Sequence, residues 1–317
     1  AKLKAVEAAL GDRPWFDEEM LATARWLSQY YMCSLAEAMR LFVPGKSSIK
    51  RHAVRNKQGR LLYYAYEERL KEKTVLAYRI NDAGRQAWEE EYLAKRAKGQ
   101  HAALGVLAAA GDWQTVQELE RQGVSAAVAR ALAQRGLVDA GQKRILRNSY
   151  ERPQQSGEYL RLTEEQRAAV DAVNEAADAG RHQCFLLQGI TGSGKTEVYL
   201  RAAAHAVDAG KQVLMLVPEI ALTAQLVKRF QAWFGSGIAV AHSKLSQNER
   251  GDVWHRMRTG QAQVLIGVRS AVFAPFAKLG LVIIDEEHES SYKQEERPNY
   301  HARDVALARC RLTGSPL

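Results

Sequence analysis

A short apolar run followed by a glycine-rich segment, FLLQGITGSGKTEVYL at residues 185–200, constrains the fold of this chain more than any other feature. It matches the pattern G-x-x-x-x-G-K-(S/T), in which glycines let backbone N–H groups turn toward phosphate oxygens at a helix N-terminus. In such a loop Lys195 meets the β- and γ-phosphates and Thr196 offers its hydroxyl to Mg²⁺. We therefore expect a nucleoside triphosphate site made of Gly189, Thr191, Gly192, Ser193, Gly194, Lys195 and Thr196. The alternative is a glycine-rich turn that binds nothing.

The second informative feature is the stretch LVIIDEEH at residues 281–288. Four apolar residues before the acids predict a buried strand that delivers them to the carboxyl end of a sheet, where α/β proteins bind ligands. There Asp285 is expected to hold Mg²⁺, and Glu286 to orient and polarise an attacking water. A strand ending in a solvated acidic turn explains this stretch equally well by itself, but its pairing with the upstream loop favours the catalytic interpretation.

Residues from about 150 onward alternate short apolar stretches with helical ones, a pattern typical of a parallel sheet covered by helices. We expect strands at residues 185–188, 212–217, 238–241, 264–268 and 281–284. The helices are expected to begin at Thr196, Thr223, Gln247 and Arg303. The predicted fold class is therefore α/β, with the arrangement of a P-loop NTPase (RecA-like) lobe.

Three further segments are expected near this site, and each has two interpretations. Gln166, in the sequence LTEEQ, has an amide that can read adenine, yet Thr163 followed by acids is also an ordinary helix-opening capping box. The segments LVPEIALT at 216–223 and IGVRSA at 266–271 follow strands at the same sheet edge. Their N–H groups, hydroxyls and the Arg269 guanidinium suit a phosphate track, whereas either segment can equally be a strand-to-helix turn.

The N-terminal part of the chain has a different pattern. Two helices are predicted at residues 17–31 and 35–42, and their aromatic residues at helical spacing are more typical of a core than of a nucleic-acid stacking surface. The basic segment 46–60 contains no acid, so phosphate contact and a solvated linker or hairpin tip both remain open. Strands are expected at 61–66 and 74–80 around a charged turn, and a connecting helix at 81–98.

Residues 101–145 contain three short helical periods followed by a predicted hairpin, which is the order of a winged helix. Ser125 is a good N-cap for the third helix, and the expected wing strands are Leu137–Val138 and Ile145–Leu146. In a winged helix the third helix enters a major groove, which would bring Arg130 and Arg135 near phosphates. A small helical domain that touches no DNA remains an equal alternative.

The composition indicates which kinds of partner, metal site and location this chain is compatible with. Lysine and arginine number 45 against 36 aspartates and glutamates, an excess of 9 that suits a polyanionic partner without proving one. Three well-separated cysteines contain no C-x-x-C pair, so we read neither a disulfide framework nor a zinc site and expect a reducing, cytoplasmic location. No apolar run approaches the roughly 20 residues of a membrane span, so no membrane partner is expected. Without an initiator Met, the chain is expected to be an internal fragment.

The motifs together resemble a known family. The order TGSGKTEVYL, LVPEIALT, HSKLS, IGVRSAVFAPF, VIIDEEHESSYKQ and NYHARDVA is similar to the first motor lobe of the PriA (primosomal protein N′) family, superfamily 2 DNA helicases of replication restart. The sequence DEEH followed by SSYKQ and YHARD is more specific to that family than the P-loop is, and the resemblance is strong over about residues 160–312. It implies that residues 149–317 are helicase lobe 1, and that Gln166 contacts the base of ATP.

The resemblance also assigns the preceding segments and a DNA contact. It implies that residues 1–45 end a 3′-DNA-end-binding domain, 46–98 are a basic linker, and 99–148 a winged helix. Residues 289–304 align with an aromatic-rich loop that links single-stranded DNA contact to ATP hydrolysis, although a tryptophan present in some relatives is missing. The DNA-binding residues implied are Arg269, Ser270, Tyr292, Lys293, Tyr300, His301 and Arg303.

The resemblance finally implies a function. This is an ATP-dependent, Mg²⁺-dependent 3′ to 5′ DNA helicase that initiates replication restart and primosome assembly at stalled or repaired forks. Its expected partners are single-stranded and forked DNA, primosome proteins and single-stranded-DNA-binding protein. The second lobe, its arginine finger and the zinc-binding cysteines of the family would lie outside this chain, so the fragment alone is not expected to unwind DNA. A double-stranded DNA translocase and a DNA-binding ATP switch without unwinding are the alternatives.

Overall fold

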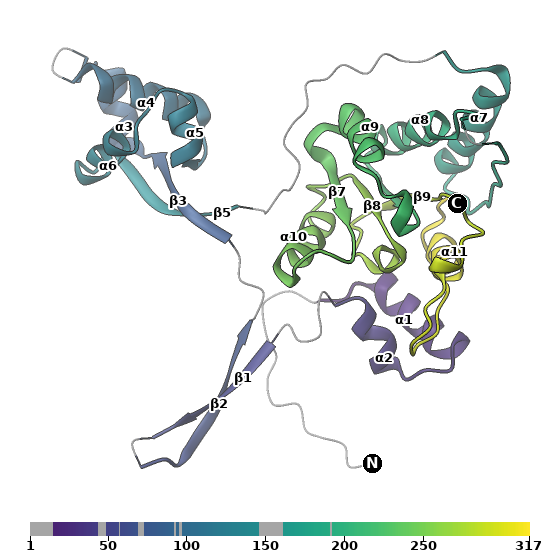
Figure 1. Cartoon of the computed structure of the whole chain (residues 1–317). Coiled ribbons are helices and arrows are strands. Elements are labelled where there is room, and N and C mark those ends of the chain that lie inside the picture. The colour runs from purple at the N-terminus through teal and green to yellow at the C-terminus, as the bar shows by residue number, and fades with distance from the viewer. Residues whose placement is uncertain are drawn as a thin grey trace. The chain divides into compact units, whose positions relative to one another are not determined.

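The computed structural model describes residues 15–43, 49–56, 58–68, 73–91, 93–94, 97–145, 161–190 and 192–317. The chain divides into two compact units (Figure 1), one made of Ala1–Leu70 with Asn148–Leu317 and the other of Lys71–Arg147. Within the described residues, no helix is both long and apolar enough to cross a membrane.

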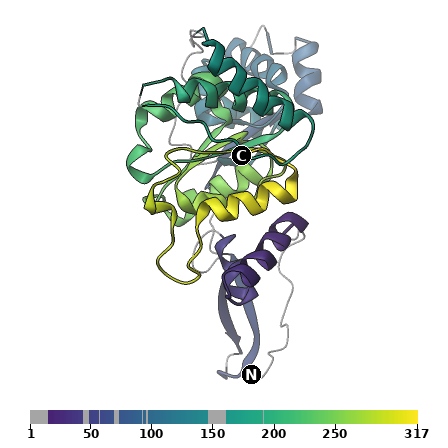
Figure 2. The same cartoon turned by 90° about the vertical axis from the view of Figure 1, so that its right-hand side faces the viewer.

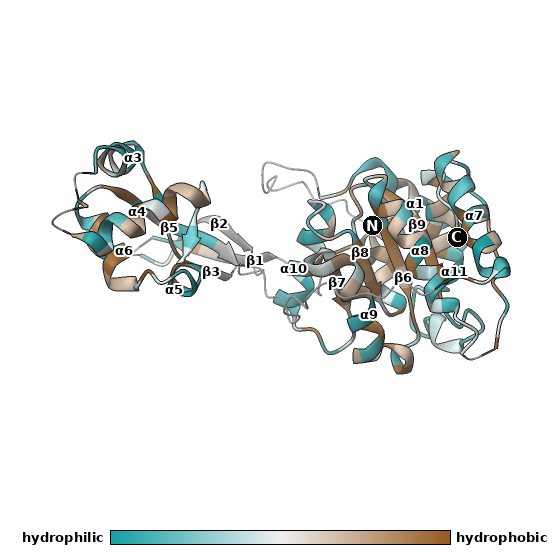
Figure 3. Ribbon diagram, turned by 90° about the horizontal axis from the view of Figure 1, so that it is seen from above, coloured by the Kyte–Doolittle hydropathy of each residue, from teal (hydrophilic) through white to brown (hydrophobic). Residues whose placement is uncertain are grey.

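The larger unit is built on a parallel sheet of four strands in the order β7-β8-β6-β9. These strands are β6 (Gln212–Leu216), β7 (Ile238–Ala241), β8 (Val264–Gly267) and β9 (Leu279–Ile284). Nearly every residue in them is buried, because a parallel sheet is covered on both faces and its strands must be continuously apolar. The strands are among the most hydrophobic parts of the chain (Figure 3). The predicted α/β fold is confirmed, and the four strands lie where the sequence placed them, with small shifts at their ends.

Helices cover both faces of this sheet. On one face α8 (Lys195–Asp208) and α9 (Ala224–Phe234) share a core with alternate strand residues such as Val213 and Met215, and α7 (Glu164–Asp178) packs beside α8. On the other face α10 (Gln247–Arg258) and α11 (Ala302–Thr313) pack against the intervening strand residues. Short 3₁₀ turns occupy the connections, at Glu219–Ala221, Gly235–Gly237, Arg269–Phe273 and Ser290–Tyr292.

The predicted strand at residues 185–188 does not form, which corrects the sequence expectation. Phe185 N–H donates to the Leu317 carbonyl (2.8 Å), Leu317 N–H donates to the Gln183 carbonyl (2.9 Å), and Val282 N–H donates to the Pro316 carbonyl (3.1 Å). A strand requires a continuing ladder, and among the described residues the pairing of this segment stops at Phe185. Residues 316–317 lie beside β9 at the edge of the sheet, and the segment at residues 183–185 is bonded to them in turn.

The first helices of the chain belong to the same unit. Helix α1 (Glu18–Tyr30) and helix α2 (Leu35–Leu41) confirm the two predicted N-terminal helices. Helix α1 lies beside α11 (Figure 2), and Met20, Leu27 and Phe42 are fully or almost fully buried in the core that α11 closes. The preference for core over an aromatic surface is right for part of this segment only, because Tyr30 is 59% exposed.

The basic segment forms part of an antiparallel hairpin rather than a linker. Strand β1 (Ile49–Arg55) pairs with β2 (Leu61–Glu68), and the described residues between them form its tip. Residues 44–48 and 57 of the segment lie outside the described part of the chain. The strands expected at 61–66 and 74–80 both form, but they do not pair with each other across the charged turn, because each has a different partner.

The smaller unit combines an antiparallel sheet with four helices among its described residues. In chain order they are β3 (Lys73–Ile80), α3 (Asp82–Glu89), α4 (Lys98–Ala110), β4 (Gln114–Thr115), α5 (Val116–Arg121), α6 (Ala126–Gln134) and β5 (Val138–Ile145). The strand order is β4-β3-β5, and buried residues of α4, α5, α6, β3 and β5 form one core, against which the partly buried Ala87 of α3 packs. The unit begins at Lys71 and not at residue 99, so β3 and α3 belong to it and not to a connector.

The expected wing hairpin within residues 137–146 is also wrong. Strand β5 is continuous over this region, and its partner along its whole length is β3, which precedes the helices in the sequence. Gly141, which lies opposite Ala77 in this ladder, marks close packing and not a turn. A Cβ at residue 141 would come 2.6 Å from the Trp113 ring, so the position has no room for a side chain.

Candidate active site

The glycine-rich loop has the backbone geometry of an anion cradle. Gly192 and Gly194 have φ values of +83° and +85°, which residues with a side chain rarely adopt. Helix α8 begins directly after Gly194, and no side chain caps its N-terminus. The first-turn N–H groups of α8 are thus free of a side-chain cap, which is the arrangement that binds phosphate at helix N-termini.

Two glycines of the loop lie close to neighbouring side chains. A Cβ at Gly189 would lie 2.5 Å from Ser193 Oγ, and a Cβ at Gly194 would lie 2.5 Å from the Gln166 amide nitrogen. Lys195 folds back over the loop, where its Nζ donates to the Gly189 carbonyl (2.7 Å). Of the remaining predicted residues, Thr196 is half-buried in the first turn of α8, and Thr191 lies outside the described residues.

Gln166 connects the start of α7 to this loop. Its carbonyl oxygen accepts the Thr163 N–H (3.0 Å), which completes the capping box that the sequence suggested. Its amide nitrogen donates to the Ser193 carbonyl (2.9 Å). Both ends of the amide therefore have protein partners, and Gln166 positions the glycine-rich loop whether or not it also contacts a base.

The acidic motif lies at the carboxyl end of β9, as predicted. Asp285 N–H donates to the Leu216 carbonyl (2.9 Å), which continues the ladder to β6, and its Oδ1 accepts a hydrogen bond from the Tyr199 hydroxyl (3.1 Å). Burial raises the pKa of Asp285 and the Glu286 charge adds to this rise, while the Tyr199 hydrogen bond and the Lys195 charge act in the opposite direction. The carboxylate is thus held in a poorly solvated position that a cation would stabilise.

Glu286 has an unusual backbone conformation for a residue with a side chain. Its φ is +46°, in the left-handed region, and its side chain is 44% exposed. Non-glycine residues in this region cost free energy and occur most often at functional sites. Glu286 and Lys195 line the same pocket of about 770 Å³, together with Tyr199, Glu287 and Arg303. The pocket therefore joins the glycine-rich loop to the acidic motif.

These residues fit a nucleotide with a divalent cation. The glycine cradle, an uncapped helix N-terminus and a lysine beside the loop are chemically suited to phosphates. The Thr196 hydroxyl and the Asp285 carboxylate are hard oxygen ligands of the kind that Mg²⁺ prefers. Tyr199 was missed by the sequence reasoning, although it lies four residues after Lys195 and therefore on the same face of α8.

In the loop after the acidic motif, two aromatic residues that were predicted to bind DNA are buried. Tyr292 is 0% exposed and its hydroxyl donates to the Asp285 carbonyl (2.7 Å). Tyr300 is 3% exposed and packs edge-on against Phe273, with ring centroids 4.8 Å apart. Both rings belong to the core beneath α11, so in this structure they cannot stack on bases.

The polar residues of the same region hold the loop together. Arg269 Nη1 donates to the Ser291 carbonyl (3.2 Å) and the Lys293 carbonyl (2.5 Å), while Ser270 is exposed. Lys293 Nζ donates to the Asn299 carbonyl (2.6 Å), and Arg303 Nη1 pairs with the Glu287 carboxylate (2.8 Å). The structure thus brings together the segments that carry Arg269 and Lys293. DNA contact by these residues stays a prediction.

His301 lies at the end of this loop and begins α11. Its Nδ1 accepts the Arg303 N–H (3.2 Å), which makes it the N-cap of the helix. Burial lowers the pKa of His301, so the neutral ring that can accept this hydrogen bond is favoured.

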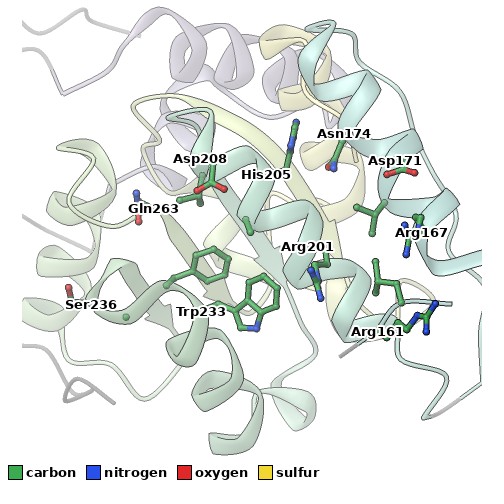
Figure 4. A pocket seen from close by; sticks show the side chains of 16 residues that line it. Arg161, Arg167, Asp171, Asn174, Arg201, His205, Asp208, Trp233, Ser236 and Gln263 are labelled. Atoms are coloured by element: carbon green, nitrogen blue, oxygen red, sulfur yellow. The ribbon is translucent and has the colours of Figure 1, made fainter. Parts of the chain in front are cut away.

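A second pocket, of about 1340 Å³, lies among α7, α8, α9 and the turns beside them (Figure 4). It is lined by Arg161, Arg167 and His205, and by Arg201, which lies over the Trp233 ring at 5.2 Å. None of the predicted catalytic or phosphate-binding residues lines it. Although larger, it contains none of the expected chemistry, so the pocket beside Lys195 is the candidate active site.

Comparisons with known proteins agree with this assignment. The sequence model of the DEAD/DEAH box helicase family matches residues 163–312, and that of a 3′DNA-binding domain (3′BD) of PriA matches residues 1–44. The chain is 42% identical over 235 residues to the replication restart protein PriA of Bacillus subtilis, covering 73% of the chain and 29% of that protein.

Two further relatives match over most of the chain. The replication restart protein PriA of Haemophilus influenzae is 36% identical over 311 residues, which cover 96% of the chain and 39% of that protein. That of Chlamydia pneumoniae is 36% identical over 305 residues, which cover 93% of the chain and 37% of that protein. The chain therefore spans between about three tenths and two fifths of the length of these relatives.

Proposed function

The chain belongs to the PriA family of replication restart helicases, and on that premise we propose that it is the ATP-binding motor lobe of an ATP-dependent 3′ to 5′ DNA helicase. The observation that carries this proposal is one pocket that contains Lys195 of the glycine-rich loop and Glu286 of the acidic motif, next to the Tyr199-bound carboxylate of Asp285.

Four residues at or beside the pocket have a defined task in this proposal. Lys195 Nζ exchanges the Gly189 carbonyl for phosphate oxygens, and the N–H groups of the first turn of α8 bind the same phosphates. Thr196 and Asp285 hold the Mg²⁺, and Glu286 accepts the proton of the attacking water at its carboxylate. When bound, ATP with Mg²⁺ supplies the phosphoanhydride bond whose hydrolysis drives movement.

The DNA side of the proposal has separate support. The match of residues 1–44 to a 3′DNA-binding domain favours DNA that presents a 3′ end, as at a fork. The basic excess of 9 charges suits a polyanion. We propose single-stranded and forked DNA as the partners, together with primosome proteins and single-stranded-DNA-binding protein in the cytoplasm, where this chain would act in replication restart.

The direct test is ATP hydrolysis by the full-length protein with and without single-stranded DNA. Glu286→Gln should reduce the DNA-stimulated rate by about 10²-fold or more, the usual contribution of a general base, while ATP binding persists. Glu175→Gln, which removes an exposed acid near the end of α7, is the matched control and should leave the rate unchanged. An unstimulated wild-type protein would instead point to an ATP switch.

A second candidate function is that of a translocase that moves on double-stranded DNA without unwinding it. The burial of Tyr292 and Tyr300 favours it, because these rings are not available to stack on bases. Such a motor has the same ATP site but no need for base stacking. A strand-displacement assay on forked DNA separates the two, because a translocase hydrolyses ATP on the fork without releasing a strand.

A further inference from the structure

The N-terminal segment is joined to the motor lobe by buried polar contacts as well as by apolar packing. Arg309 of α11 is 0% exposed and forms two hydrogen bonds to the Glu19 carboxylate of α1, at 2.8 and 2.6 Å. Trp254 of α10 donates its indole N–H to the Phe42 carbonyl (2.8 Å). Residues 15–43 are therefore a structural part of the lobe and not a loosely attached neighbour.

One side chain of this segment reaches the loop that follows the acidic motif. Tyr31, at the end of α1, donates its hydroxyl to Asp304 Oδ2 (2.9 Å) and accepts the His301 N–H (3.0 Å). Burial raises the pKa of Tyr31 well above its usual value, so the hydroxyl stays protonated and available as a donor. Lys293 Nζ lies 5.6 Å from the centre of the Tyr31 ring.

These contacts touch both ends of one loop. Lys293 and His301 pair with each other in an antiparallel bridge, so residues 293–301 close on themselves directly beside Tyr31. The residue before Lys293 is Tyr292, whose hydroxyl is bonded to the Asp285 carbonyl. An unbroken series of contacts thus runs from Tyr31 through this closed loop to the acidic motif.

We propose that Tyr31 is a positioning residue: it holds the loop 293–301 in the conformation that communicates between DNA bound by the N-terminal segment and ATP hydrolysis at Asp285 and Glu286. The proposal rests on the proposed function, since it needs a DNA-stimulated ATPase. Its physical basis is that two sites influence each other only through an element whose conformation both of them bias, and the loop contacts both.

The test compares Tyr31→Phe with Tyr30→Phe in the full-length protein. Both changes remove one hydroxyl, but Tyr30 is 59% exposed and its hydroxyl has no hydrogen bond within the described residues. Tyr31→Phe should lower the DNA-stimulated kcat at least about fivefold, since it removes two hydrogen bonds that order the loop. It should leave the rate without DNA and the KM for ATP unchanged, and Tyr30→Phe should change none of these values.

A second measurement follows the loop itself, without nucleotide or DNA. Hydrogen exchange at the His301 amide should be faster in Tyr31→Phe, whereas the amide of Val305, deeper in α11, should be unaffected. Asp304→Asn should reduce the DNA-stimulated rate in the same direction. In the double variant, the fold-reduction of the DNA-stimulated rate should be much smaller than the product of the two single fold-reductions, because both changes act on one contact.

The outcomes separate this inference from the proposed function. A wild-type protein whose ATPase is not stimulated by DNA would overturn both. If DNA stimulates the ATPase of the wild-type protein and that of Tyr31→Phe equally, only the inference about Tyr31 is wrong. Equal losses with and without DNA would also overturn it, because Tyr31 would then support folding alone.

Discussion

Glu19→Ala should destabilise the large unit by about 3 kcal/mol. The change removes the carboxylate that binds Arg309, a fully buried guanidinium, and removal of one partner of a buried ion pair typically costs about 3–5 kcal/mol. We take the lower end for two reasons. Arg309 Nη1 keeps its bonds to the Val272 and Ala274 carbonyls, at 2.6 and 2.9 Å, and the Glu19 side chain is 20% exposed, so water can reach part of the vacated space.

The assay is native-state hydrogen exchange of the α11 amides. It reports the free energy of unfolding of the large unit, whereas a single melting curve would combine the unfolding of both units. Glu18→Ala is the matched control, since it removes an exposed acid from the same helical turn and should cost within about 0.5 kcal/mol. Glu19→Gln should lie between the two, because its amide oxygen still accepts one guanidinium hydrogen bond.

A loss below about 1 kcal/mol for Glu19→Ala, equal to that of Glu18→Ala, would refute the reasoning. It would mean that water or another acceptor solvates Arg309 and that α1 is not locked to α11 through this pair. Replacing both partners by methionine is the complementary experiment. This pair of substitutions leaves no buried charge, but it should not restore wild-type stability, because the Val272 and Ala274 carbonyls lose the donor that Arg309 supplies.

Further predictions concern the active site and the N-terminal contact. Asp285→Asn should raise the unfolding midpoint of the nucleotide-free chain while it abolishes hydrolysis. Burial raises the folded-state pKa of Asp285, so its stabilising contribution is lost as pH rises through that pKa, and the advantage of Asn over wild type in thermal unfolding should grow over the same interval. Gly194→Ala should cost more stability in urea than Gly192→Ala, although both have positive φ, because only at Gly194 does a Cβ clash; equal losses would contradict this. Trp254→Phe should cost about 1–2 kcal/mol in the same assay, since it leaves a buried carbonyl of the N-terminal segment without its donor.

The catalytic motifs could be predicted because their information is local. The glycine-rich loop, the apolar run before Asp285 and the helix-opening residue Thr163 each act on neighbours a few residues away, and the structure places all three as expected. Local sequence patterns did not predict which strands pair with each other. Strands β2 and β3 were expected on either side of a charged turn, but β3 pairs with β5, about 65 residues further along, and no local pattern specifies that choice.

The aromatic loop shows the same limit for function. Tyrosines in a loop after an acidic motif suit base stacking, and the sequence alone could not show that Tyr292 and Tyr300 are buried under α11. Burial depends on which surfaces meet, and here α1 covers the helix that starts at residue 302, more than 250 residues away in the chain. The interaction that decides the role of the loop is therefore not visible in its own sequence.

The sequence by itself determined the fold class of the large unit, the phosphate cradle and the acidic residues, because backbone conformation and strand burial follow from short-range residue pattern. The tertiary structure decided the strand partners of the small unit, the Tyr199 contact to Asp285, and the link from Tyr31 to the loop. These depend on packing between segments far apart in the chain, where the free energy comes from the fit of two surfaces and not from the propensity of either one.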